Sequence, residues 1–178
     1  MDLTKSINNL SFFTVTILNW YPLLKEDKYK DIIINSFKYL TTEEKVKIAA
    51  FVIMPNHIHI AWKIRDNLKL KDIQRDLLKF TAQSIKNDLS ANNKSILKNF
   101  YVGLKDREYQ FWQRNPLTIE LFTEEVAKQK IEYIHYNPVS EKWKLCNIPQ
   151  DYKYSSAKYY YDGIKDWDFL THYDEIYD

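Results

Sequence analysis

The spacing of hydrophobic and polar residues predicts strands and helices in alternation along the chain. Residues 11–19, 46–53 and 57–64 are rich in β-branched and aromatic residues, or alternate between apolar and polar, and each predicts a strand. Apolar residues at helical spacing predict helices over 28–40, 69–89 and 123–137. Between the last two, we expect a polar loop over 90–97 and a further strand or hairpin arm over 98–112.

Two local signals refine these boundaries. Pro55 and Asn56 interrupt the apolar run between the second and third strands, which indicates a hairpin or a bulged connection. The last helix is expected to end at Asn137, because a residue that precedes a proline is disfavoured in the α region.

The order strand, helix, strand, strand, helix, strand, helix predicts an α+β fold. An antiparallel sheet of ferredoxin-like type, with helices packed on one face, fits this order. The chain has 178 residues, and we expect one domain over 1–178. Its core is expected over about 11–160, and the aromatic and acidic tail over 161–178 receives no assignment.

Composition adds two hints of nucleic-acid binding. The chain carries 14 Tyr, 9 Phe and 5 Trp, and such aromatics either fill the core or stack on bases. The net charge is only +2, but residues 63–86 hold seven Lys or Arg against three Asp. This segment is either a solvated helix face or a track for a phosphate backbone. The candidate DNA-binding residues are Lys69, Lys71, Arg75, Lys79, Arg107 and Arg114.

Other classes of protein are disfavoured. Cys146 is the single cysteine, which excludes an intrachain disulfide and a cysteine metal cage. No apolar run is long enough for a transmembrane helix, and the first ten residues lack the apolar core of a signal peptide. We therefore expect a cytoplasmic protein without a membrane partner.

Two histidines stand one residue apart in the stretch MPNHIHI, at 54–60. Residues i and i+2 of a strand point to the same face, so His57 and His59 project together and Ile58 and Ile60 project to the other face. Two neutral imidazoles on one face can share a metal ion, with a third ligand and open positions that suit catalysis. The alternative is a pair of strand histidines that face water or hydrogen-bond partners.

The stretch IEYIHYNP, at 131–138, supplies a candidate third ligand. Ala127, Ile131 and Ile134 form an apolar stripe on the predicted helix, and Tyr133 and Asn137 share the roughly opposite face. Asn137 can offer a carbonyl oxygen to a metal, and Tyr133 a nucleophilic oxygen. Tyr136 lies nearby on the same side and is the rival nucleophile; a surface or packing role is the alternative for Tyr133.

These stretches resemble a known family. MPNHIHI is similar to the MPNHxH signature of HUH single-strand endonucleases of the tyrosine transposase type. KIEYIHYNPV resembles a segment of REP-associated tyrosine transposases and their insertion-sequence relatives, and FWQR and YKYSSAKYY are also similar to segments of this family. The chain departs from the family pattern after Asn-Pro-Val, where Ser140-Glu141-Lys142-Trp143 replaces a frequent Arg-Ala-Gly.

The resemblance implies a metal-dependent transposase with the HUH fold that cleaves and rejoins single-stranded DNA, near a hairpin or palindromic element. It implies that His57, His59 and Asn137 bind the metal and that Tyr133 forms a 5′-phosphotyrosine intermediate. Mg²⁺ or Mn²⁺ suits an amide oxygen, a phosphate and two imidazoles, although ligand type alone leaves zinc open. A homodimer is compatible with the resemblance.

Three other interpretations stay open at this level. The chain is a non-catalytic nucleic-acid-binding domain of the same fold, a metal-dependent nuclease that uses water, or a ferredoxin-like interaction domain whose histidines are incidental.

Overall fold

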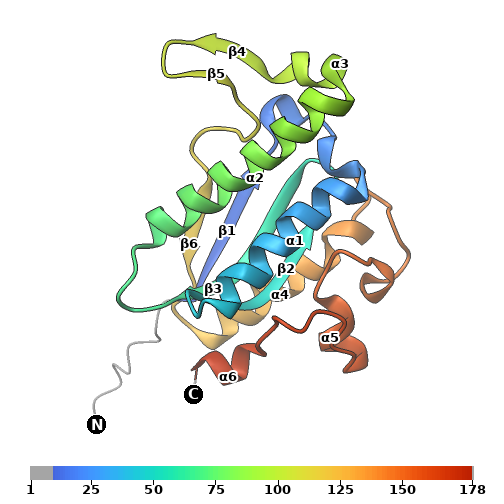
Figure 1. Cartoon of the computed structure of the whole chain (residues 1–178). Helices are drawn as coiled ribbons and strands as arrows, with labels where there is room; N and C mark the ends of the chain where they lie inside the picture. Colours follow the sequence, from blue (N-terminus) through green and yellow to red (C-terminus); the bar gives the residue numbers. More distant parts are fainter. Residues whose placement is uncertain (1–9, 178) are drawn as a thin grey trace.

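A four-stranded antiparallel sheet forms the centre of the computed structural model, which describes residues 10–177 (Figure 1). The strands lie in the order β2-β3-β1-β6. Their bounds are β1 Leu10–Thr16, β2 Val46–Ile53, β3 His57–Ile64 and β6 Leu117–Glu120. Together with the helices that connect β1 to β2 and β3 to β6, this order gives the predicted α+β fold of ferredoxin-like type.

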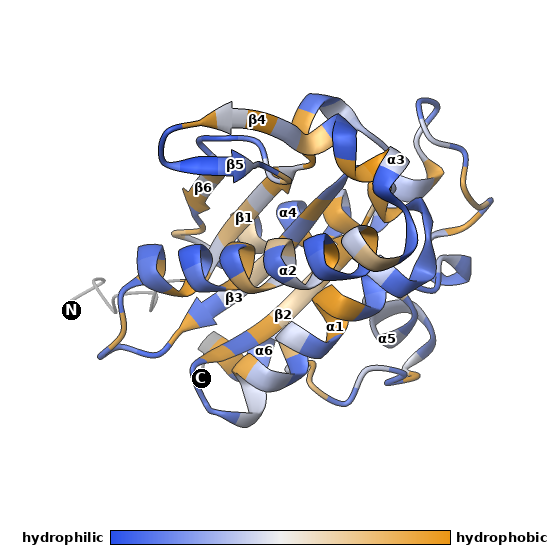
Figure 2. Cartoon of the chain, turned by 45° about the horizontal axis from the view of Figure 1, so that its top comes forward, coloured by the Kyte–Doolittle hydropathy of each residue, from blue (hydrophilic) through white to orange (hydrophobic). Residues whose placement is uncertain are grey.

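Two long helices cover one face of the sheet, α1 (Asp27–Thr42) and α2 (Leu70–Asn92). The apolar side of α2 faces the sheet and its polar side faces solvent (Figure 2). The core between these helices and the sheet is built from large side chains, among them Phe13, Phe37, Phe51 and Trp62. The predicted helical spacing over 28–40 and 69–89 is therefore confirmed.

A third helix, α4 (Glu124–Tyr136), packs on the opposite face. Its buried stripe of Ala127, Ile131 and Ile134 meets small side chains of the strands, such as Ala50 and Ala61. The expectation that all helices share one face is wrong. The physical reason is that the central strands are apolar on both faces, so that both need cover.

The segment between α2 and β6 differs from the prediction in two ways. The prediction of a polar loop over 90–97 is wrong, because α2 continues to Asn92 and a short helix α3 (Lys94–Leu97) follows. The Asn93 side chain accepts a hydrogen bond from the Ile96 N–H (3.1 Å) and so caps α3. Polar residues here end one helix and start the next.

The predicted hairpin arm over 98–112 is present, but it lies outside the main sheet. It contains a 3₁₀ turn η3 (Lys98–Phe100) and the two strands β4 (Tyr101–Leu104) and β5 (Arg107–Tyr109). The fourth strand of the main sheet is β6, which the sequence did not predict. Its four residues are too few, and too exposed, to give a clear alternating pattern.

The remaining segments are short helices and irregular chain. Their bounds are η1 Leu18–Trp20, η2 Leu23–Lys25, η4 Asn137–Val139, η5 Pro149–Asp151, α5 Ala157–Asp162 and α6 Tyr173–Tyr177. Backbone hydrogen bonds from the C-terminal part cover the outer edge of β2, including Thr171 N to Ile48 O (2.9 Å). In the described part of the chain, no helix is long and apolar enough to cross a membrane.

Candidate active site

The two histidines of β3 share one face of the sheet, as their spacing predicted. His57 and His59 are buried, with ring centroids 4.7 Å apart, while Ile58 and Ile60 enter the core on the other face. The β1 residues Thr16 and Thr14 lie directly opposite them in the antiparallel register. The imidazoles thus point to the α4 side of the sheet, at the end where β2 turns into β3.

Asn56 fixes the His57 ring. Its amide nitrogen donates to the Trp20 carbonyl (3.1 Å), and its amide oxygen lies 2.8 Å from His57 Nδ1. Since a carbonyl only accepts, the amide nitrogen must face Trp20, and the oxygen must face the imidazole. His57 Nδ1 therefore carries the proton and donates it, which leaves Nε2 with a free lone pair for a ligand.

The helix α4 brings the phenol and the amide to the same place. Thr123 caps the helix by accepting a hydrogen bond from the Val126 N–H (3.2 Å), and Asn137 directly follows its last residue. Asn137 keeps α-helical angles (φ −54°, ψ −47°) and starts a 3₁₀ turn. The helix thus ends one residue from the predicted position, but the reason given, that the proline pushes Asn137 out of the α region, is wrong.

One pocket of about 520 Å³ contains the predicted metal ligands and both candidate nucleophiles. We call it the histidine pocket, and we call four of its residues the histidine cluster: His57, His59, Tyr133 and Asn137. The Tyr133 ring lies 5.3 Å from the His59 ring, between centroids. Tyr136 also lines the pocket, but its ring contact is with Tyr161 (6.3 Å). Tyr133 is therefore the better placed of the two phenols.

Burial keeps both imidazoles neutral. Desolvation lowers the pKa of His57 to about 4 and that of His59 to about 3, and for His59 the neighbouring His57 adds to the effect. At neutral pH both rings therefore carry a lone pair instead of a second proton, the form that binds a metal.

The histidine cluster fits a divalent cation. Within residues 10–177 no group of three His, Cys, Asp or Glu residues is placed to hold a metal, so a third ligand has to be an amide, a hydroxyl or water. The Asn137 side chain lies 3.3 Å from His59 Nε2, and its buried Oδ1 has no hydrogen-bond partner. Rotation of this amide turns Oδ1 toward the imidazoles, which gives two nitrogens and one oxygen with open positions.

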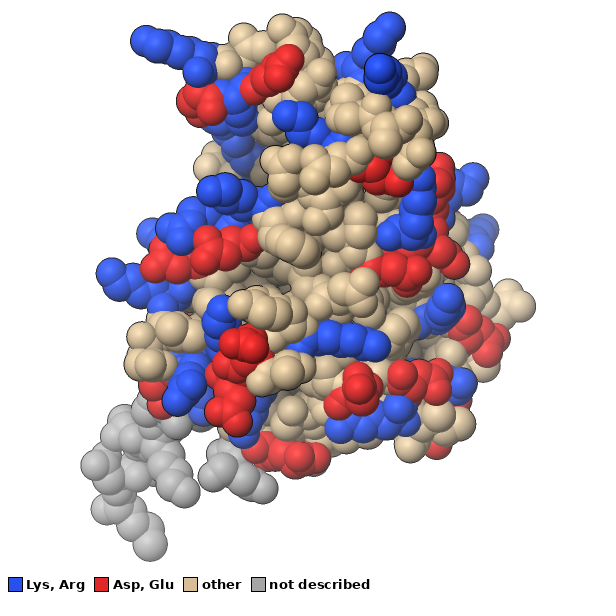
Figure 3. All heavy atoms as spheres, viewed as in Figure 1, with Lys and Arg blue, Asp and Glu red and all other residues tan. Residues whose placement is uncertain are grey.

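The six predicted DNA-binding residues do not line this pocket. Lys71, Arg75 and Lys79 are exposed on α2, and Lys69 is exposed directly before it; α2 covers the opposite face of the sheet. Figure 3 shows that face, where Lys and Arg alternate with Asp and Glu. Arg75 is paired with Asp72 (2.8 Å) and with Asp76 (2.9 Å).

The other two predicted residues lie on or after the β4-β5 hairpin. Arg107 pairs with Asp106 (2.6 Å), and Arg114 lies 3.9 Å from the same carboxylate. Arg114 also follows Gln113, whose N–H donates to the carbonyl of the pocket residue Thr16 (2.7 Å). Of the six, it is the one that the backbone ties to the pocket.

Several pocket residues were missed by the sequence analysis. Lys142 and the aromatic pair Trp20 and Trp143 line the pocket, and Lys130 lies 5.3 Å from the Tyr133 ring centroid. Lys130 belongs to α4, and the sequence analysis gave it no role. The others come from irregular segments without periodicity, so no local signal identified them.

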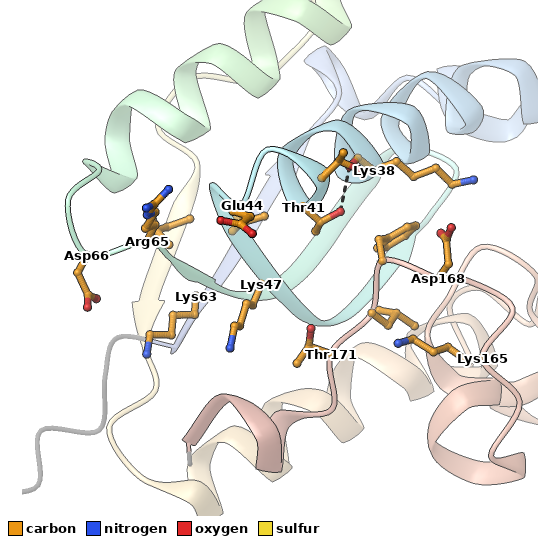
Figure 4. Close-up of a pocket in the computed structure, with 15 residues that line it drawn as sticks. Lys38, Thr41, Glu44, Lys47, Lys63, Arg65, Asp66, Lys165, Asp168 and Thr171 are labelled. Carbon is orange, nitrogen blue, oxygen red and sulfur yellow. Dashed lines mark hydrogen bonds between the residues drawn. The ribbon is translucent and has the colours of Figure 1, made fainter.

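A larger hollow of about 760 Å³ lies elsewhere, at the outer edge of the sheet (Figure 4). Its walls come from the end of α1, from β2 and β3, and from the segment around Leu170. Its cations (Lys38, Lys47, Lys63, Arg65 and Lys165) outnumber its acids (Glu44, Asp66 and Asp168). No histidine, tyrosine or cysteine lines it, so it offers neither an imidazole nor a thiolate to a metal and no phenol to a phosphate.

Comparisons with known proteins agree with this geometry. The family model described as "Transposase IS200 like" matches residues 12–137, which include the whole histidine cluster. A solved structure of a REP-associated tyrosine transposase bound to a REP hairpin has a TM-score of 0.65 and 19% identity, over 92% of this chain and 86% of that one. At this identity it supports the fold alone.

A putative transposase from Deinococcus radiodurans R1 gives a TM-score of 0.46 and 15% identity, over 75% of this chain and 95% of that one. No match was found among curated proteins.

Proposed function

The chain belongs to the IS200-like transposase family, and on this premise we propose that it cleaves and rejoins single-stranded DNA with Tyr133 as the nucleophile. The observation that carries the proposal is the histidine cluster itself. Strand β3 and helix α4 bring two neutral imidazoles, an unpartnered amide oxygen and a phenol into one pocket. All four side chains belong to one chain, which supports a site formed within that chain.

We propose that His57 Nε2, His59 and Asn137 hold Mg²⁺ or Mn²⁺. When bound, this ion supplies a Lewis acid that offsets the negative charge of the scissile phosphate and orients it. The Asn56 hydrogen bond keeps His57 Nε2 aimed into the pocket, and Lys130 and Lys142 add positive charge on either side.

Tyr133 then attacks the phosphorus in line. The phenol gives up its proton to solvent as its oxygen bonds to phosphorus, the bond from phosphorus to the 3′ oxygen breaks, and that oxygen takes up a proton and leaves as a 3′-hydroxyl. The 5′-phosphotyrosine keeps the ester for a second strand, whose 3′-hydroxyl reverses the step and reseals the DNA. A DNA hairpin is the proposed partner, because the structurally similar transposase is bound to one.

The test is a denaturing gel with a pool of labelled single-stranded hairpin DNAs and Mn²⁺. We expect a slow-migrating, protease-sensitive adduct with the wild-type chain and its complete loss in Tyr133→Phe. Tyr136→Phe is the matched control, because it removes the neighbouring phenol of the same pocket, and it should keep the adduct.

Each rival interpretation has its own outcome in this experiment. Cleavage without any adduct favours a nuclease that uses water. An adduct that persists in Tyr133→Phe and disappears in Tyr136→Phe transfers the role to Tyr136. DNA binding without cleavage or adduct, whether or not Mn²⁺ is present, favours the non-catalytic binding domain.

A homodimer remains a prediction that light scattering checks. A mass of two chains, with adduct formation unchanged on dilution to the monomer, agrees with a site contained within one chain.

A further inference from the structure

Two tryptophans flank the mouth of the histidine pocket. Trp20 and Trp143 both line it, and the Lys142 ammonium lies over one face of each indole, 5.3 Å from the Trp20 ring centroid and 5.5 Å from the Trp143 ring centroid. The Trp143 ring lies 5.6 Å from the His57 ring. Two indole faces thus stand directly beside the proposed phosphate site.

The Trp20 indole is held out in solvent by a strained turn. Its side chain is 57% exposed, which is unusual for so large an apolar group. Asn19 (φ 55°) and Trp20 (φ 57°) both adopt left-handed backbone angles, which asparagine tolerates but which are costly for a bulky residue such as tryptophan. Strain of this kind persists only where the surroundings fix it, and it is concentrated at functional sites.

Hydrogen bonds from three segments fix the turn. The Trp20 N–H donates to the Ile17 carbonyl (3.0 Å), and the Asn19 N–H donates to the Gln113 side chain (3.3 Å). Asn56 donates to the Trp20 backbone carbonyl and also accepts from His57, so one amide positions both the Trp20 backbone and the proposed metal ligand. The backbone that carries the exposed indole is therefore fixed relative to the phosphate site.

Trp143 is tied to the same site from the other side. Its backbone N–H donates to the Ser140 carbonyl (2.9 Å), and the Ser140 hydroxyl donates to the Asn137 backbone carbonyl (2.8 Å). The ring is half-buried against the core under α4. The second indole is thus carried by the turn that carries the proposed ligand Asn137.

We propose that Trp20 and Trp143 form a slot that takes one unpaired nucleobase, next to the phosphate held by the histidine cluster. This inference rests on the proposed function, and it names the part of the DNA strand that the pocket recognises. Every base has a π-face, and indoles stack on it without regard to sequence. Lys142 and the polar pocket residues Thr16 and Asn137 suit the attached phosphate, whereas an apolar peptide would leave them unpaired.

The slot predicts a loss of binding that depends on the base. The probes are an oligothymidylate of about eight nucleotides and an abasic oligomer of the same length, which carry equal numbers of phosphates. Binding is measured by fluorescence anisotropy without added metal, in a Tyr133→Phe background that performs no chemistry. Trp20→Ala should weaken binding of the oligothymidylate by about 5- to 150-fold, the range measured for one base stacked on an aromatic ring. Binding of the abasic oligomer should change by less than about twofold, because no base is left to stack.

Two further variants separate stacking from structural damage. Phe80→Ala removes an equally exposed aromatic (59%) from α2 on the opposite face, and it should bind both probes as the parent does. Trp20→Phe should recover part of the affinity for the oligothymidylate, because it keeps a π-face in the same turn. Thermal melting of each variant checks that the fold is retained.

The slot is overturned if Trp20→Ala binds the oligothymidylate like its parent, or loses affinity for both probes equally. It is also overturned if the parent binds the two probes with the same affinity. Failure of the proposed function gives a different result. If the wild-type chain forms no adduct but Trp20→Ala still shows the base-dependent loss of binding, the proposed function is wrong and the slot is supported. Adduct formation without the base-dependent loss keeps the transposase chemistry and removes the slot.

Discussion

The two faces of the sheet differ in the side chains that they bury. Under α1 and α2, large rings such as Phe51 and Trp62 interlock in a continuous apolar core. Under α4, the core is smaller and contains several alanines, and at one end it gives way to the buried histidine cluster. Two polar atoms of that cluster, His59 Nδ1 and Asn137 Oδ1, are buried without a hydrogen-bond partner.

This contrast separates stability from function. Buried polar atoms without partners cost free energy, whereas close-packed rings stabilise the fold. The α1–α2 face also holds one such atom, Trp62 Nε1, but under α4 two of them lie together in the histidine pocket, where a ligand can satisfy them. Four predictions test the contrast, beginning with the largest effect of a single substitution.

The largest effect is expected when one large side chain is removed from the α1–α2 face. Phe51→Ala leaves a cavity where the ring now packs against Phe37 and Phe169 (5.6 Å each, between centroids), and should lower the free energy of unfolding by about 3–5 kcal/mol. Chemical denaturation measures it.

The matched variant on the other face is His59→Leu, one strand away. It replaces a buried ring whose Nδ1 lacks a partner by an apolar group of similar size and loses only the long contact of Nε2 with Asn137 (3.3 Å), so the metal-free protein should lose much less stability than Phe51→Ala does. Equal destabilisation by both variants would contradict the difference between the faces.

The second prediction concerns acid, because three buried histidines all lie on the α4 side. Burial lowers the pKa of His57 to about 4 and those of His59 and His135 to about 3. These values lie below that of an unfolded histidine, so between about pH 6.5 and pH 4 the unfolded chain binds more protons and stability falls as the pH falls.

Each such histidine contributes about 1.4 kcal/mol per pH unit in that window. Denaturation in EDTA at several pH values measures the slope. His135→Gln should reduce the slope by about 1.4 kcal/mol per pH unit, which corresponds to one proton fewer taken up on unfolding. A slope equal to that of the wild type would show that His135 is protonated in the folded state.

The third prediction is a stabilisation by metal that depends on the histidine pocket. At 100 times its dissociation constant, Mn²⁺ should raise the free energy of unfolding by about 2.7 kcal/mol. His57→Ala should abolish the response, and His135→Gln should keep it, since His135 bonds to Ser156 (2.7 Å) and does not line the pocket. A response that survives in His57→Ala would place the metal elsewhere.

The smallest effect is expected from the residue that orients His57. Asn56→Ala removes the acceptor for Nδ1–H and should weaken Mn²⁺ binding about 10- to 100-fold in calorimetry. Nitrogen NMR of the ring should show loss of the single Nδ1–H form. Asn99→Ala, an exposed asparagine in η3, should change neither quantity.

The short-range part of the site could be predicted from the sequence. Alternation along β3 placed His57 and His59 together, and helical spacing placed Tyr133 and Asn137 on one side of α4. The same periodicities located both long helices and three of the four strands of the sheet. They work because the side-chain directions within one helix or strand follow from its own backbone geometry.

Other parts depended on packing between distant segments. The pattern of α4 says which side of the helix is apolar, but not which face of the sheet it covers. That choice brings Tyr133 to the histidines and leaves the basic residues of α2 on the far face. The strand β6 is short and half-exposed, and it is recognisable by its pairing with β1.

The sequence by itself therefore determined the elements and the chemical groups that each presents, because backbone geometry is local. Tertiary structure decided which of those groups meet. Trp20, Asn56 and Trp143 come from irregular segments far apart in the chain, and long-range hydrogen bonds and packing alone bring them to the histidine pocket.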